Sequence, residues 1–166
     1  MKRFRNKPFA TALLLAIILI FSSCDSDDYE WREGDLSYIT TIPVNDGRIR
    51  YNFNLGYDLV EVYKGRYDRI DDIAYAYGEI NIYTKGNYID RFTLSLGNSN
   101  VTLPVLVRSN RDGVLSSDND YQVDDFLNAV VEVIRRNGYA TIYIDGNADG
   151  RFELDFYINV DAYVRY

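Results

Sequence analysis

The chain has 166 residues, of which 25 are acidic and 18 are basic, so its formal net charge is −7. Because it contains no histidine and a single cysteine, Ser-His-Asp and Cys-His catalytic groups, His-ligated zinc and a disulfide within the chain are excluded. The acidic balance and the lack of a basic patch with interleaved aromatics argue against nucleic acid as a partner.

Residues 1–23 have the layout of a cleaved export signal. Four Lys and Arg residues within positions 2–7 precede an apolar stretch over 9–21, which is shorter than the roughly 20 residues that a membrane-spanning helix needs. Phe21-Ser22-Ser23-Cys24 closes this stretch. The segment resembles the signals of bacterial lipoproteins, in which the cysteine is diacylated and becomes the new N-terminus. This resemblance implies cleavage before Cys24 and its lipidation, with fatty acids such as palmitate.

An acidic run, Asp25-Ser26-Asp27-Asp28, follows the cysteine directly. It resembles the signal that Bacteroidota-type lipoproteins use to reach the outer face of the outer membrane. The resemblance covers residues 1–28 and implies an outer-membrane lipoprotein that faces the cell exterior, although a solvated linker also explains these acids. After cleavage 25 acidic and 14 basic residues remain, a net charge of −11. That charge argues against adhesion to anionic lipid, so the acyl group is the expected membrane anchor.

The next residues, 24–36, are polar, acidic and without periodicity, and we predict that they form a tether. Trp31, the only tryptophan, is predicted either to pack on the edge of the fold or to be loosely held. The remaining part, 37–166, has a normal size for one domain with its own core. The sequence therefore predicts a signal peptide, an acidic tether and a single β-rich domain.

From residue 37 onward, runs rich in Val, Ile, Tyr and Phe alternate with turn residues at a spacing of about ten, which is typical of antiparallel all-β folds. In the last run, strict alternation between apolar and polar residues from Phe152 to Arg165 predicts one buried and one solvated face. We therefore expect a β-sandwich or a small β-barrel of about eight strands. The predicted strands are 37–44, 48–55, 57–64, 74–84, 89–97, 101–107, 139–145 and 151–165.

One α-helix is predicted over 124–137, where it would cover one side of a sheet or a barrel mouth. Asp124 or Asp125 is the predicted N-cap, and Gly138 is the predicted stop after two arginines. Residues 129–134 are rich in β-branched side chains, so taken alone they also fit a strand.

Two segments of seventeen residues, 78–94 and 138–154, share eight identical residues at matching positions. We predict that each forms a β-hairpin with a Gly-Asn pair at the bend. Duplication explains this repeat, and so does chance similarity among tyrosine-rich strands.

Asp145-Gly146-Asn147-Ala148-Asp149-Gly150 matches the first half of the calcium loop D-x-[DN]-x-[DN]-G. The match stops at Phe156, which occupies the position of the bidentate Glu. An ordinary turn is the alternative, because Asp, Asn and Gly are favoured in turns. Calcium is the only cofactor that the sequence suggests, and its predicted ligands are Asp145, Asn147, Asp149 and Glu153.

The chain contains sixteen tyrosines, and alternation places several of them on shared faces. The predicted ligand-binding residues are Tyr75, Tyr77, Tyr157 and Tyr163. The first two are expected on one face of their strand, and the last two on the solvated face of the final strand. On neighbouring strands they would form an aromatic, hydrogen-bonding surface for a glycan or a protein. Pairing across strands to support the fold is the alternative.

Catalytic chemistry is limited to carboxylates, tyrosines, arginines and serines. Asp71 with Asp72, and Asp155 with Asp161, are candidate carboxylate pairs for glycan hydrolysis, but acidic pairs also arise freely in such a chain. The sequence therefore predicts a membrane-anchored, non-enzymatic binding or scaffolding module. A carboxylate-based glycan hydrolase and a calcium-stabilised adhesion module are the alternatives.

Overall fold

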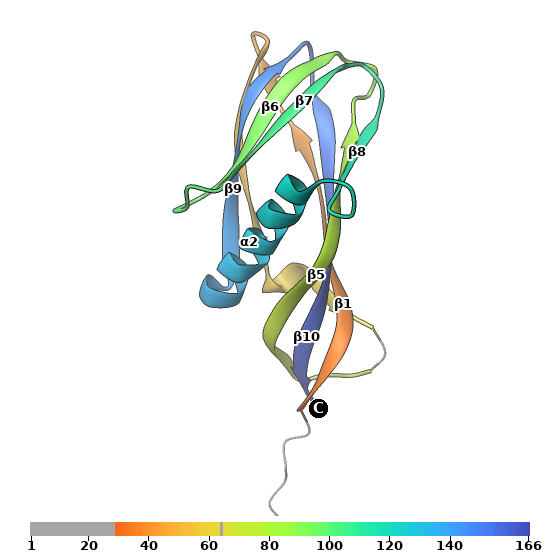
Figure 1. The fold of residues 1–166 in the computed structure, drawn as a ribbon, viewed down its shortest axis with the longest axis vertical. Helices are drawn as coiled ribbons and strands as arrows, with labels where there is room; N and C mark the ends of the chain where they lie inside the picture. Colours follow the sequence, from red (N-terminus) through yellow and green to blue (C-terminus); the bar gives the residue numbers. More distant parts are fainter. Residues whose placement is uncertain (1–28, 64) are drawn as a thin grey trace, which may run out of the picture.

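The computed structural model describes residues 29–63 and 65–166. Figure 1 shows elongated β-sheets with a helix beside them. The elements in chain order are β1 (Tyr29–Ile42), β2 (Val44–Asn45), β3 (Arg48–Gly56), the 3₁₀ helix η1 (Tyr57–Leu59), β4 (Val60–Val62), β5 (Arg69–Tyr83), β6 (Ile89–Leu96), β7 (Thr102–Ser109), β8 (Gly113–Ser116), α2 (Tyr121–Asn137), β9 (Tyr139–Ala148) and β10 (Phe152–Arg165).

The strands form two five-stranded sheets. Sheet A has the order β4-β1-β10-β5-β8, and sheet B has the order β2-β3-β9-β6-β7. The pairings are antiparallel in both sheets. Neither sheet closes on itself, so the fold is a sandwich and not the barrel that was the alternative. The predicted mainly antiparallel β-sandwich with one helix is confirmed.

The core lies between the two sheets, and β10 contributes much of it. Every second residue of β10 from Phe152 to Val164 is fully buried, as the alternation of its sequence requires. Phe156 contacts Phe53 of sheet B, with ring centroids 5.3 Å apart, and Phe152 contacts Phe92 at 5.7 Å. Each such ring stabilises the fold by about 1.5–3 kcal/mol through burial. These contacts hold the sheets together.

The prediction that the repeated segments form hairpins is wrong. β5 pairs with β10 and β8, whereas β6 pairs with β9 and β7, so the chain passes from sheet A to sheet B between β5 and β6, and from sheet B to sheet A between β9 and β10. The two crossovers touch each other. Phe92 contacts its repeat counterpart Phe152, and the Nδ2 of Asn87 donates to the carbonyl oxygen of Arg151 at 2.8 Å. Each copy of the repeat therefore forms a corner at which the chain passes from one sheet to the other.

The helix α2 begins three residues earlier than predicted, because its N-cap is Asp120. The Asp120 carboxylate accepts a hydrogen bond from the backbone nitrogen of Gln122 at 2.9 Å, which satisfies one of the free donors of the first turn. The predicted end is confirmed, since Gly138 adopts the left-handed conformation with φ of 82°.

One side of α2 is buried against the inner face of sheet A. A side chain at Gly78 of β5 would place its Cβ 2.8 Å from Cδ1 of Leu127, so glycine at this position lets the helix approach the strand. The buried residues of the helix are Val123, Phe126, Leu127, Val130, Val131 and Ile134. Helix and sheet together thus complete the core.

The first strand, β1, begins at Tyr29, well before the predicted start of the domain at residue 37. It pairs with β10 along its whole length, from Tyr29 opposite Arg165 to Ile42 opposite Phe152. Residues 29–36, predicted to belong to the tether, are therefore part of sheet A. Their charged side chains hid the strand pattern.

Several sequence predictions fall outside the described residues. These are the signal peptide over 1–23, the lipidated Cys24 and the acidic run up to residue 28. Across residues 29–63 and 65–166, no helix is both long enough and apolar enough to cross a membrane.

Candidate functional site

The solvent-facing side of sheet A carries a block of side chains that we term the tyrosine face. It consists of three rows across β1, β10 and β5, with a residue of β10 in the middle of each row, together with Tyr63 after β4. The rows are Ile39, Asp155 and Asn81; Ser37, Tyr157 and Glu79; and Asp35, Asn159 and Tyr77. Two predicted ligand-binding residues, Tyr77 and Tyr157, therefore lie on adjacent strands in adjacent rows.

Tyr77 and Tyr157 interact directly. Electrostatic repulsion from Tyr157, burial, and a side-chain hydrogen bond with Tyr157 all raise the pKa of Tyr77 above its ordinary value. Tyr77 remains 43% exposed and Tyr157 is half-buried, so both rings reach the surface. Paired tyrosines of this kind offer a ligand rigid apolar area and polar hydroxyls at a small entropic cost.

Tyr63 is a third tyrosine of this face, which the sequence analysis missed. Its backbone nitrogen donates to the carbonyl oxygen of Glu33 at 3.1 Å, so the chain continues along β1 after β4. A side-chain hydrogen bond with Asp35 is the main cause that raises the pKa of Tyr63 to about 12, and Tyr157 acts in the same direction. The predicted strand over 57–64 contains Tyr63, but its sequence does not reveal its pairing partner, and the pairing of β4 with β1 brings Tyr63 to the face.

Asp35 is the least accessible charged residue of the tyrosine face. It lies on the solvent side of β1, opposite Asn159, yet it is only 6% exposed. Its Oδ1 atom has no hydrogen-bond partner among the described residues. Buried polar atoms are nearly always paired, and an unpaired one costs about 1–3 kcal/mol. Because this oxygen is buried, a hydrogen-bond donor of a ligand reaches it only when the side chains that cover it move.

The structure places Tyr75 on the opposite side of sheet A from Tyr77, so the predicted shared face is wrong. Tyr77 is opposite Asn159 while Tyr75 is opposite Val160, because β5 has one extra residue between them. This bulge turns Tyr75 towards α2, where its hydroxyl donates to Asp124 at 2.8 Å. Burial, together with that hydrogen bond, raises the pKa of Tyr75 to about 12.

Tyr163 lies on the solvent side of β10 but far from Tyr157, at the end of the sheet where β1 begins. Its ring stacks on Tyr29, with centroids 5.3 Å apart, and contacts Trp31 at 5.2 Å. Trp31 thus packs on the fold, which is one of the two alternatives for it. The four predicted tyrosines occupy three separate places, and only Tyr77 and Tyr157 meet.

The predicted calcium ligands do not form a loop. β9 continues to Ala148, so Asp145 and Asn147 lie within a strand, where Asp145 is opposite Arg50. Glu153 forms an ion pair with Lys85 at 2.8 Å. Among the residues that the structure describes, no group of three or more acidic or Cys side chains is placed to hold a metal ion.

The carboxylates that were candidates for hydrolysis lie in different settings. Asp155 and Asp161 are six residues apart on one strand, which is about 20 Å. Glycosidases need separations of about 5–9.5 Å, so these two residues cannot act as a pair. Asp71 forms an ion pair with Arg69, and Asp72 accepts a hydrogen bond from the Nε of Arg135 at 2.8 Å.

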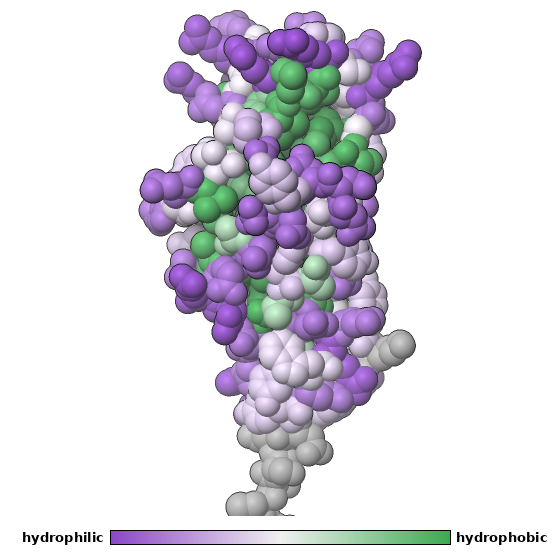
Figure 2. Space-filling view, viewed as in Figure 1, coloured by the Kyte–Doolittle hydropathy of each residue, from purple (hydrophilic) through white to green (hydrophobic). Residues whose placement is uncertain are grey.

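The two ends of the molecule differ in character. Figure 2 shows hydrophobic side chains gathered at the end that carries β7 and β8. A hollow of about 240 Å³ lies there, and its lining includes Ile82, Val105, Leu106, Val114 and Leu115. The opposite end, next to the start of β1, is paler in the same view, which is the colour of intermediate hydropathy.

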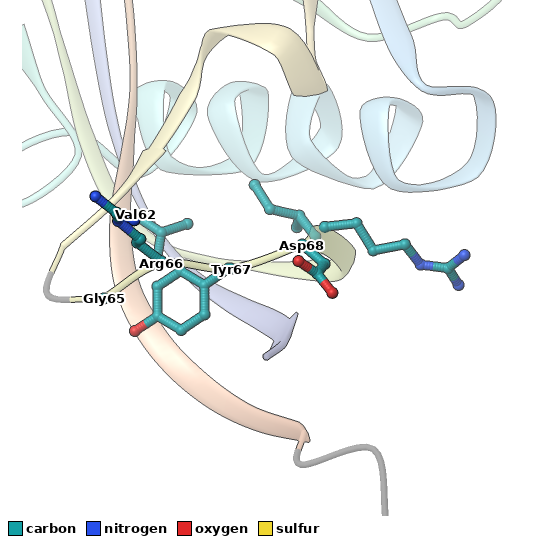
Figure 3. A pocket seen from close by; sticks show the side chains of 7 residues that line it. Val62, Gly65, Arg66, Tyr67 and Asp68 are labelled. Carbon is teal, nitrogen blue, oxygen red and sulfur yellow. The ribbon is translucent and has the colours of Figure 1, made fainter. Parts of the chain in front are cut away.

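A second hollow, of about 550 Å³, lies in the segment between β4 and β5. Figure 3 shows the Tyr67 ring in this hollow between the side chains of Arg66 and Asp68. Its wall is completed by Val62 and Ile70, so the hollow is amphipathic.

Comparison with protein-family models, with curated proteins and with solved structures finds no match for this chain. The candidate site therefore stands on its own geometry.

Proposed function

We propose that the chain is a lipoprotein that is anchored through Cys24 to the outer membrane and faces the cell exterior, where its tyrosine face binds glycans without converting them. The export-signal layout before Cys24 and the acidic run after it support the location. The geometry of sheet A supports the binding activity.

The observation that carries the binding proposal is the group of exposed, interacting tyrosines beside Asp35, whose buried Oδ1 has no partner among the described residues. Sugars present hydroxyl donors for carboxylate and amide oxygens, and apolar C–H faces for aromatic rings. Tyr77 and Tyr157 supply rings, and Asn159 supplies an amide between them and Asp35. A glycan laid across the rows covers the exposed ring surface, and it satisfies the Asp35 acceptor when the side chains over that oxygen move aside.

Binding is tested by screening the purified protein against an array of defined oligosaccharides and titrating the best hit by calorimetry. Tyr157→Ala and Asp35→Asn are each expected to weaken binding by about tenfold or more, which corresponds to about 1.4 kcal/mol. Tyr143→Ala is the matched control, because Tyr143 is 50% exposed on the other sheet.

Two results would contradict this proposal. One is the absence of any bound oligosaccharide on the array. The other is an equal loss of binding in Tyr143→Ala, which would mean that the tyrosine face is not the contact. Recovery of a shortened oligosaccharide after incubation, abolished in Asp155→Asn, would replace binding by hydrolysis.

The location is tested separately, by mass spectrometry of the native protein and by digestion of intact cells with a protease. We expect a mature chain that begins at Cys24 and carries acyl chains, and a protein that the protease removes from intact cells. Cys24→Ala is expected to lose the acyl mass and to leave the membrane fraction. An uncleaved start or an unmodified thiol would overturn the anchor.

A further inference from the structure

Aromatic side chains gather at the end of sheet A where β1 begins and β10 ends. This group, which we term the aromatic end, consists of Tyr29, Trp31, Tyr67, Tyr163 and Tyr166. Trp31 is 51% exposed and Tyr166 is 47% exposed, so large ring surfaces face the solvent. Figure 1 shows this end as the narrow tip of β1, β5 and β10, which extends beyond the helix.

Contacts hold these rings in two groups. Tyr163 lies against Tyr29 and Trp31, and Tyr67 lies against Tyr166, with centroids 5.2 Å apart. Arg32 joins β1 to the chain end, because its Nη2 donates to the Tyr166 hydroxyl at 2.8 Å. The aromatic end is therefore a fixed structure and not a set of independent side chains.

Charged groups of both signs lie at this end, and besides two ion pairs they include Arg66, Asp68 and Arg165. Arg32 forms an ion pair with Glu30, and Arg69 forms one with Asp71. Rigid amphipathic rings among charges of both signs match the interfacial region of a bilayer, where Trp and Tyr lie at the level of the lipid headgroups. This mixture of both signs favours zwitterionic lipid, since anionic lipid attracts a surface on which positive charge predominates.

The chain between Cys24 and the fold is short. Because β1 begins at Tyr29, five residue steps separate it from Cys24, and they reach at most about 17 Å when fully extended. An anchor at Cys24 thus keeps the aromatic end, and not the end with β7 and β8, beside the lipid surface.

We propose that the aromatic end is a membrane-docking surface that seats Trp31 and the neighbouring tyrosines among the headgroups of a phosphatidylcholine-like bilayer. This proposal rests on the lipid anchor of the proposed function. Docking fixes the long axis of the sandwich upright on the membrane and points the tyrosine face sideways, above the lipid surface.

Trp31 is the only tryptophan in the chain, so its fluorescence reports on this end alone. The acylated, mature native protein is reconstituted into phosphatidylcholine vesicles, with or without bromine in the acyl chains as a quencher. Docking is expected to lower Trp31 emission by about half in the brominated vesicles and to shift it to shorter wavelength. The matched control is Trp31→Phe with Leu106→Trp, which moves the reporter to the opposite end and is expected to show no quenching.

Lengthening the tether distinguishes docking of the aromatic end from simple proximity of this end to the membrane. Insertion of roughly ten Gly and Ser residues before Tyr29 adds about 35 Å of reach, and a docked end is expected to stay quenched. Loss of quenching in this variant, or no quenching in the parent although vesicle flotation shows it anchored, would overturn the docking surface alone. Failure to float with the vesicles would overturn the anchor and the docking surface together.

Discussion

The two outer faces of the sandwich are both built from antiparallel strands, but the polar side chains on them have different kinds of partner. On sheet B, Arg50 is opposite Asp145, and Thr141 donates to the side-chain oxygen of Asn54 at 2.7 Å. On sheet A, tyrosines interact with one another, and Asp35 keeps an oxygen without a partner among the described residues.

We interpret this difference as one between an ordinary solvated surface on sheet B and a candidate binding site on sheet A. Polar groups that pair across strands, as Thr141 and Asn54 do on sheet B, need no further partner and contribute modestly to stability. A buried acceptor left unpaired lowers stability and persists where the surrounding structure or a ligand compensates for it. Sheet A is therefore where we expect recognition, and sheet B supplies the matched controls.

The largest expected change in stability distinguishes the buried face of β10 from its solvent-facing side. Phe156→Ala removes a fully buried ring that contacts Phe53 of the other sheet, so we expect a loss of about 3–5 kcal/mol in the free energy of unfolding. Tyr157→Ala, one residue further, is expected to cost less than about 1 kcal/mol if its ring serves recognition. Urea denaturation measures both. Equal losses would make Tyr157 a structural residue.

A smaller difference in stability is expected between two tyrosines of β5 that are close in sequence but lie on opposite sides of the sheet. Tyr75→Phe removes the hydrogen bond to Asp124 of α2 and is expected to cost about 1 kcal/mol. Tyr77→Phe is expected to stay within about 0.5 kcal/mol, because Tyr77 lies on the exposed side. The reverse order in denaturation experiments would contradict the bulge between them.

The raised pKa values of Tyr63 and Tyr75 predict a loss of stability at high pH. Both values rise from 10.0 to about 12, so the folded state holds these protons more tightly than the unfolded state. Their stabilising contribution is therefore complete below pH 10 and is lost as the pH rises to about 12. The double variant Tyr63→Phe with Tyr75→Phe is expected to lose less stability over this range, measured by denaturation at several pH values. An equally steep loss would count against both assignments.

The smallest effect is expected on sheet B. Arg50→Gln removes an exposed charge opposite Asp145 and is expected to change the free energy of unfolding by less than about 0.5 kcal/mol. Glycan affinity is expected to stay the same. A loss above about 1 kcal/mol, or weaker glycan binding, would end the distinction between the two faces.

Where local periodicity is strong, the sequence predicts this fold well. The alternation from Phe152 to Val164 identifies β10 and its buried face, and Gly138 marks the end of α2. Which strands pair with each other is harder to predict, because pairing joins residues that are far apart in the chain. The corners after β5 and β9 carry ordinary turn residues, and the sequence does not distinguish a return within one sheet from a crossing between two.

The candidate site was predicted only in part, for similar reasons. Alternation identifies Tyr157 and Tyr77, but one extra residue in β5 reverses the face of Tyr75, and a bulge has no clear local signal here. Asp35 was assigned to the tether because charged neighbours hid its strand. Asp145 and Asn147 fitted a loop motif, although their composition equally suits the exposed side of a strand next to arginines.

The pairing of β1 with β10 has a mechanical consequence. Fourteen residue pairs join these strands, and β1 is the first strand after the proposed anchor at Cys24. In the proposed function, flow pulls on a ligand held by the sandwich while the lipid holds the chain, and the load then runs along the axis of β1. It then strains the whole ladder in shear, and no single pair opens first. An exposed receptor joined to its membrane in this way resists drag better than one that peels apart from one end.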